Sequence, residues 1–417
     1  LSVLDMNIYF QSPIKIFKYK NFRYVWLSEG LSLFGSEMEM IVLAIYVFQT
    51  TGSPFHVAAI SALKFGGNFL APVFGVFVDK FDRKKLQLIV RYFGFSVSLM
   101  FLMIMIIYKL EIWHIYILVS LGSILRTLDL LVIQSLTADS VPSDNLHGAL
   151  GISRSTLDAS RVISFAMGGL ILEFFGIVWV YVTIAGVNIL AIWAAIKINK
   201  PTQITTPFNN IFKNLQMGFH EVKINKKIQV LIFFSFMIEM TVFPLVNGMI
   251  AVFAKEFFHL GATGTGLLAS VISLGTLTGA LIVASNKQFH KPGYTIIIGS
   301  IIWHLLSLTM IFSNSLVLTM ILLLGWGVAG GVTFVAMISS LIRLSPDATR
   351  GRIMGLRALA IYGLPIGLLF SGWLAESLEV KQMIIIPSIM GVFGTLLSII
   401  VWPSVLKITF EKLPNKN

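Results

Sequence analysis

A succession of apolar segments runs along almost the whole sequence. A helix needs roughly 20 apolar residues to cross the hydrocarbon core of a bilayer. We predict about twelve such spans, at residues 22–49, 57–78, 88–108, 114–138, 155–175, 177–197, 228–252, 263–285, 294–313, 316–342, 353–375 and 382–403. The sequence therefore predicts an all-α integral membrane protein with twelve transmembrane helices.

Composition supports the bilayer as the solvent. Of 417 residues, 56% are hydrophobic and 12% are Asp, Glu, Lys or Arg, whereas a soluble domain carries about 25% charged residues. The chain has no Cys, which excludes disulfides and thiolate metal sites. Its seven His residues show no metal-ligand spacing. We expect no metal and no cofactor.

Basic residues gather in alternate connections between the predicted spans. Lys and Arg accumulate in cytoplasmic loops, so these connections are assigned to the cytoplasm and both termini lie there. The residues are Lys15, Lys18, Lys20, Arg23, Arg83, Lys84, Lys85, Lys213, Lys223, Lys226, Lys227, Lys287, Lys291, Arg350, Arg352, Lys407 and Lys412. Topology explains the net charge of +12 better than nucleic-acid binding does.

The longest connection divides the spans into six and six. We predict a cytoplasmic N-terminal segment (1–21), a first six-helix bundle (22–197), a cytoplasmic linker (198–227), a second bundle (228–404) and a cytoplasmic tail (405–417). Residues 1–12 lack the features of a signal peptide. They contain NIYFQS, which resembles a protease recognition site, and we exclude them from functional reasoning.

Two loops suggest that the halves are repeats. SLTADSVPSDNLHGALG follows the fourth span and SLIRLSPDATRGRIMG follows the tenth. Pro142 and Gly151 have the same separation as Pro346 and Gly355. Weak internal symmetry at half-length is typical of transporters, although a chance match of one loop is an alternative.

The stretch GVFVDKFDRKK, residues 75–85, resembles the loop signature of the major facilitator superfamily. Gly75, Asp79, Lys80, Arg83 and Lys84 fall on the signature, and Asp82 replaces the usual Gly. With stretches such as FRYVWLSEGLSLFGSEM and TGSP, this departure resembles the branch of bacterial macrolide-efflux and enterobactin-export proteins. The resemblance implies two pseudo-symmetric six-helix bundles and a monomeric secondary transporter.

A cytoplasmic gate is expected at this signature. Asp79 would stand at the C-terminus of the second span, where the helix dipole disfavours a carboxylate. The resemblance implies Arg83 and the start of span eleven near Arg352 as its partners. Gly75 would allow close helix approach. The predicted gate residues are Gly75, Asp79, Arg83, Lys84 and Arg352. The alternative is that they only fix topology.

Ionisable residues inside spans indicate a pathway or a relay. By the resemblance, spans one, four, seven and ten line a central cavity, where these residues would converge: Glu29, Glu39, Arg126, Asp129 and Glu239. A carboxylate in a low-dielectric cavity can bind and release a proton near neutral pH. We rank the three Glu as proton carriers, Arg126 as the cation that modulates them, and Glu37 as the weakest candidate. Structural ion pairs are the alternative, with Arg126 bound to Asp129 and Lys64 to a span-one Glu.

Three further groups have two interpretations each. Arg154 and Arg161 lie with Asp158 on one stripe, which fits either an anionic substrate or an ion-pair cluster. His304 is expected to be a structural histidine with its hydrogen bonds satisfied. Gly325, Gly327, Gly330 and Gly331 indicate bending or close packing rather than a phosphate loop, which would follow a strand.

The sequence thus predicts a secondary transporter of the bacterial inner membrane. We expect export of a small amphipathic molecule, a siderophore-like metabolite or a drug, in exchange for protons. Uptake of a siderophore or nutrient, and lysolipid flipping, are the alternatives. The sequence shows no Walker motif for ATP-driven transport and no clustered catalytic residues for a membrane enzyme. A non-transporting receptor would not need so many acids in its spans.

Overall fold

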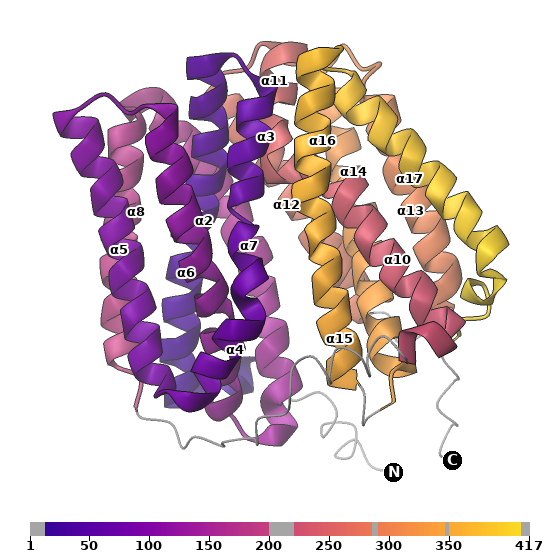
Figure 1. The fold of residues 1–417 in the computed structure, drawn as a ribbon, viewed down its shortest axis with the longest axis horizontal. Helices are drawn as coiled ribbons and strands as arrows, with labels where there is room; N and C mark the ends of the chain where they lie inside the picture. The colour runs from indigo at the N-terminus through magenta and orange to yellow at the C-terminus, as the bar shows by residue number, and fades with distance from the viewer. Residues whose placement is uncertain (1–12, 200–220, 286–290, 347–349, 410–417) are drawn as a thin grey trace. The chain divides into compact units, whose positions relative to one another are not determined.

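The computed structural model describes residues 13–199, 221–285, 291–346 and 350–409, and all regular structure within these ranges is helical. Figure 1 shows the helices in chain order. The chain divides into two compact units. Unit 1 comprises residues 1–39, 66–164 and 174–208, and unit 2 comprises residues 40–65, 165–173 and 209–417. Two helices of the first half of the chain therefore contribute one part to each unit.

Unit 1 is built mainly from the first half of the chain. Its elements are η1 (Pro13–Lys18), the first part of α2 (Lys20–Thr51), η2 (Gly66–Leu70), α4 (Ala71–Lys80), α5 (Arg83–Ile107), α6 (Ile112–Asp139), most of α7 (Ser143–Phe175) and α8 (Ile177–Ile196). The helix α7 begins at Ser143 and not near residue 155 as predicted, so most of the loop that echoes its counterpart after span ten is helical.

Asp82, the residue that departs from the family signature, begins α5. Its side chain accepts hydrogen bonds from the backbone N–H groups of Lys84 and Lys85, at 3.0 and 3.2 Å. A short acidic side chain at this position satisfies backbone donors that have no partner inside the helix. The Lys84 ammonium in turn donates to the carbonyl of Ile196, at the end of α8. The charged loop therefore orders two helix ends.

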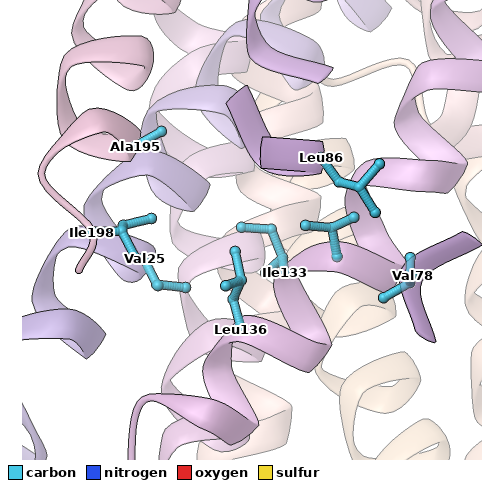
Figure 2. Packing of buried hydrophobic residues seen from close by; sticks show 8 residues of the cluster. Val25, Val78, Leu86, Ile133, Leu136, Ala195 and Ile198 are labelled. Atoms are coloured by element: carbon cyan, nitrogen blue, oxygen red, sulfur yellow. The ribbon is translucent and has the colours of Figure 1, made fainter. Parts of the chain in front are cut away.

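A hydrophobic cluster holds the helices of unit 1 together near this loop (Figure 2). It joins α2, α4, α5, α6 and the C-terminal end of α8. The buried residues are Val25, Val78, Leu86, Val132, Ile133, Leu136, Ala195 and Ile198. Branched side chains from five elements interdigitate here, so the charged loop stands on a close-packed base.

The predicted second span is not one continuous helix. It consists of α3 (Pro54–Leu63), the 3-10 turn η2 and α4. Gly67 packs so closely on α6 that an added Cβ would overlap the Ser123 carbonyl oxygen. The Gly67 N–H donates to the Ser123 hydroxyl, at 3.1 Å. A side chain of α6 thus satisfies a backbone group that the break leaves without a helical partner, as a membrane interior requires.

Unit 2 contains the second half of the chain together with α3 and the adjoining parts of α2 and α7. Its other elements are α10 (Lys226–Thr241), the π-turn η3 (Leu245–Met249), α11 (Ile250–Phe258), α12 (Ala262–Ser285), α13 (Pro292–Met310), α14 (Leu316–Leu344), α15 (Arg350–Leu359), η4 (Ala360–Tyr362), α16 (Gly363–Ser377), α17 (Gln382–Val401) and η5 (Pro403–Val405). The helices α3 and α16 lie side by side in this unit (Figure 1).

Among the described residues, 10 helices are long and apolar enough to cross a membrane. The other two predicted spans are the broken α3–η2–α4 segment and the charge-bearing α7. The predicted ends of most spans differ from the observed ends by a few residues. Span seven continues past the predicted residue 252 to Phe258 through the π-turn.

Glycines bring α12 and α14 into direct backbone contact. An added Cβ at Gly327 would overlap the Ile272 carbonyl oxygen, and one at Gly331 would overlap that of Thr276. Small residues permit such close approach between membrane helices. The predicted close packing of the span-ten glycines is therefore confirmed at these positions. Gly325 differs, because its nearest neighbour would be a Leu306 methyl group at 3.6 Å.

Candidate functional site

A partly open cavity of about 120 Å³ lies within unit 1, between α2, α5, α6 and α8. Four charged side chains contribute to its wall, together with serines of α2 and an amide of α8. The polar lining residues are Ser32, Ser36, Glu39, Arg91, Ser98, Arg126, Asp129 and Asn188. Burying so many polar groups in a membrane helix bundle is costly, which makes this cavity the candidate functional site.

Arg91 of α5 contacts three side chains from two neighbouring helices. Its Nη1 lies 2.7 Å from Oδ2 of Asp129 and 2.7 Å from the Ser32 hydroxyl, and its Nε donates to the Ser28 hydroxyl at 3.0 Å. The Arg91 side chain is 3% exposed and that of Asp129 is 18% exposed. One buried guanidinium therefore joins α2, α5 and α6.

Sequence reasoning missed Arg91, although the rule that selected the other charged residues applies to it. Arg91 stands inside the predicted span 88–108. The ion pair between Arg91 and Asp129 also differs from the predicted pairing of Arg126 with Asp129. Within the described residues, the second oxygen of Asp129, Oδ1, is buried without a hydrogen-bond partner.

Glu37 is the centre of a second charged cluster. Its side chain is 0% exposed and lies 3.0 Å from Nε of Arg161 and 3.6 Å from Nη2 of Arg126. The three residues come from α2, α7 and α6. Two cations around one carboxylate compensate the cost of burying it. Glu37, ranked last from the sequence, thus has the most central position in the charge network of unit 1.

The two predicted span-one carriers have different surroundings. Glu39 lines the cavity, and its Oε1 accepts a hydrogen bond from the hydroxyl of Tyr181 at 3.3 Å. Glu29 is absent from the cavity lining and accepts a hydrogen bond from Ser153 of α7, at 2.8 Å. Glu29 and Glu39 of α2 therefore contact different helices, α7 and α8.

The arginines proposed as anion contacts both take part in ion pairs. Arg154 lies 3.6 Å from Asp158, one turn along α7, while Arg161 binds Glu37. The Arg154 side chain is 54% exposed. These contacts favour the interpretation of the stripe as an ion-pair cluster.

This cavity is not the central cavity that the resemblance implied, which stays a prediction. The resemblance implied a lining from spans one, four, seven and ten, whereas this cavity takes α2 and α6 from that set and adds α5 and α8. All of its lining residues belong to unit 1. Glu239 of α10 belongs to unit 2 and is buried. A Cβ at Gly363 would lie 3.2 Å from the Cβ of Glu239, so the acid packs against the start of α16.

The predicted gate residues are only partly described. Arg83 forms an ion pair with Asp139 of α6, at 2.7 Å, a partner that the sequence analysis did not foresee. The side chains of Asp79 and Arg352 fall outside the described part, so the gate that joins them stays a prediction. A Cβ at Gly75 would meet no described atom within 4 Å, so close helix approach at this glycine stays a prediction.

A smaller cavity of about 20 Å³ lies in unit 2, beside the π-turn η3 between α10 and α11. Thr241, Pro244, Ser307, Ser371 and Ser388 contribute to its wall. In the turn, Gly248 has φ +155°, a conformation that only glycine adopts without strain. Interrupted helices occur in transporters where the backbone lines a cavity.

His304 is buried close to this smaller cavity and both of its ring nitrogens have partners. Nδ1 lies 2.7 Å from the Ser300 carbonyl oxygen, and Nε2 lies 2.9 Å from the Thr241 hydroxyl. The histidine is therefore a satisfied structural residue, as predicted.

Comparison with known proteins identifies the family. A model of the family described as "Transmembrane secretion effector", a branch of the major facilitator superfamily, matches residues 11–408. The chain belongs to the major facilitator superfamily. Its relatives are transporters rather than enzymes. This assignment agrees with the all-α, multi-pass architecture.

Two curated relatives of this superfamily member are exporters by name. Macrolide efflux protein A from Streptococcus pyogenes is 22% identical over 288 residues, 66% of this chain and 69% of that protein. Enterobactin exporter EntS from Shigella flexneri is 22% identical over 353 residues, 80% of each chain.

Solved structures of the superfamily share the fold. A bacterial homologue of the human lysosomal transporter Spinster, inward-facing and unoccupied, has a TM-score of 0.73 at 13% identity. It covers 94% of this chain and 98% of its own. The D-xylose-proton symporter has a TM-score of 0.70 at 14% identity and covers 91% and 97%. At such identities the likeness concerns the fold alone.

Proposed function

We propose that this chain exports a small amphipathic molecule, a siderophore-like metabolite or a drug, in exchange for protons. The membership of the major facilitator superfamily supports alternating access. The two relatives named as exporters support the outward direction. On the charge pattern, the protein would lie in the bacterial cytoplasmic membrane with both termini inside, and the family resemblance implies a monomer.

The charged cavity of unit 1 is the observation that supports the proposal of proton coupling. It places Glu39, Arg126, Arg91 and Asp129 around one space of about 120 Å³. A proton on Asp129 would weaken its ion pair with Arg91, and Arg91 also holds two serines of α2. Gain or loss of one proton would thus change contacts among three helices. In this scheme Glu29, Glu39 and Glu239 remain the proposed carriers, and Arg126 modulates them.

The cytoplasmic gate completes the proposal. Asp79 would hold the start of α15 near Arg352 when the cytoplasmic side is shut. Gly75, Arg83 and Lys84 would position that carboxylate. Alternate formation and release of this contact would separate the two access states.

The test measures proton flux driven by substrate in everted membrane vesicles with an acidic interior. A macrolide and a catecholate siderophore serve as probes, and a pH-sensitive dye reports the gradient. We expect one probe to accumulate and to dissipate the gradient. Glu39→Gln and Glu239→Gln should abolish both signals, whereas Glu379→Gln, which changes an exposed loop acid, should leave them intact.

Other outcomes would replace parts of the proposal. Accumulation that persists after an uncoupler removes the gradient would rule out proton exchange. Transport of a lysolipid with no dependence on the gradient would indicate flipping. In iron-depleted cultures, siderophore secretion should fall without the gene. Unchanged secretion together with impaired uptake of the iron-loaded compound would reverse the direction.

A further inference from the structure

Two helix starts in unit 2 are capped by glutamates from other helices. Oε2 of Glu173, near the end of α7, accepts a hydrogen bond from the Thr263 N–H of α12 at 2.6 Å. Oε2 of Glu376, near the end of α16, accepts one from the Phe55 N–H of α3 at 3.2 Å. The same oxygen accepts one from the Ser53 hydroxyl at 2.8 Å. All of these residues belong to unit 2.

The two contacts match at the helix backbone, although the α3 start is also capped by Ser53, whose hydroxyl accepts from the His56 N–H at 3.2 Å. Thr263 and Phe55 are each the second residue of their helix, and in both cases the same carboxylate oxygen is the acceptor. The glutamates end two matching sequences, GLILE at residues 169–173 and GWLAE at residues 372–376. Both follow the loops that echo each other in the two halves. The second contact is therefore the symmetry mate of the first.

A glycine one turn before each glutamate adds a tight helix crossing. A Cβ at Gly169 would overlap the Ala262 carbonyl oxygen, and one at Gly266 would overlap that of Phe165. In the other contact, a Cβ at Gly372 would overlap the Ala58 side chain. Each contact thus combines a small-residue crossing with a charged cap.

The α12 start depends on its partner. The residue before the helix is Gly261, which has no side chain to cap it, and the Glu173 carboxylate occupies the space that a Cβ there would need, at 2.8–3.0 Å. A carboxylate at a helix N-terminus satisfies free N–H groups and is favoured by the helix dipole. Unlike the buried pairs of unit 1, both glutamates are exposed, so water can replace the contact when it opens.

We propose that Glu173 and Glu376 are paired latches of a gate at the connections that the charge pattern assigns to the outside of the membrane. Alternating access would require residues 40–65 and 165–173 to leave unit 2, and both caps would then break and re-form once in each cycle. The gate would set the equilibrium between the closed and open states in the absence of substrate. It depends neither on the substrate nor on proton coupling.

The absence of Cys from the chain permits a direct test with one reporter. Ser61→Cys is nearly isosteric, and Ser61 is 4% exposed, on the face of α3 that meets Gly248. A membrane-impermeant maleimide added from outside should label the introduced thiol only when the gate opens. On this background, Glu173→Ala and Glu376→Ala should each raise the labelling rate about fivefold, the typical worth of a helix cap. The double variant should raise it about 25-fold, as independent contributions would.

Glu256→Ala and Glu379→Ala are the matched controls, because each removes an exposed acid close in sequence to α12 or after α16. They should leave labelling unchanged. If an Ala variant fails to fold, Glu→Gln keeps an acceptor oxygen and should give a smaller increase. Unchanged labelling in both latch variants would overturn the gate. An increase in only one would overturn the pairing. Labelling needs no substrate, so this test stands apart from the vesicle experiment.

Discussion

Units 1 and 2 build their interiors by different means. Unit 1 buries ion pairs, with Glu37 between two arginines and Arg91 against Asp129. Unit 2 brings backbones together at glycines, as where Gly327 meets Gly275, and packs Trp303 edge-to-face against Trp326. Buried charges seldom stabilise more than apolar packing would, so their retention points to chemistry. Glycines at these contacts let the helix backbones approach each other closely. The comparison places the described buried ion pairs in unit 1, whereas unit 2 holds the α12–α14 glycine contacts and the proposed carrier Glu239.

Among the variants that test this comparison, Glu37→Ala should have the largest effect on stability and transport. It leaves Arg126 and Arg161 without the carboxylate that they share, and removal of one partner of a buried ion pair costs about 3–5 kcal/mol. We expect a large loss of thermal stability in detergent and no transport. Glu29→Gln is the control, because it removes a charge that accepts one hydrogen bond from Ser153. Equal stability of the two variants would show that the cluster is not a structural centre.

Two glycines of α14 test the unit 2 side of the comparison. Gly327→Ala places a methyl group on the Ile272 carbonyl and should cost about 1–3 kcal/mol. Gly325→Ala, two residues away, meets only ordinary contacts. It should stabilise the helix by about 0.5–1 kcal/mol. Thermal melts of both variants supply the measurement. A shift of the same sign in both would contradict close packing as the role of Gly327.

Substitution of Asp82 is expected to have the smallest effect, and it tests whether a charge of unit 1 outside the cavity has only a structural role. Asp82 is a charge of unit 1 that caps a helix outside the cavity, so its role should be structural only. Asp82→Ala should cost about 1 kcal/mol, and Asp82→Gly only a few tenths. Transport per folded molecule should stay unchanged in both. A transport defect in Asp82→Gly, the residue usual in the family signature, would assign the side chain a role in gating.

Much of the fold follows from the sequence, because the membrane imposes length and hydrophobicity on each span. The ends of α8, α12 and α14 were predicted within two residues. The break in span two was missed although Gly66, Gly67 and Asn68 mark it. Hydrophobicity averaged over a span of about 20 residues does not reveal three residues that interrupt the helix. The turn in span seven was signalled in the same way by Pro244, Asn247 and Gly248.

Charge pairing could not be predicted to the same degree. The positions of Glu37 and Arg161 lie 124 residues apart, and only packing of α2 on α7 brings them together. Glu37 was ranked low because it points away from Glu39 on the same helix. Arg91 could have been predicted without tertiary information, because the rule that selects charged residues inside spans applies to it as well. The latch glutamates stand at span ends, where an acid is common and gives no signal by itself.

The helix α2 passes from unit 1 into unit 2 between Glu39 and Met40 without a break, whereas span two changes unit next to the turn η2. One residue inserted near Glu39 would rotate everything after it by about 100° around the helix axis. That rotation would turn residues 40–51 away from their neighbours. One residue inserted in the turn before η2, ahead of the Gly67 contact with α6, would only lengthen that turn. Insertions and deletions among relatives should therefore collect at residues 64–66, while the length of span one stays fixed.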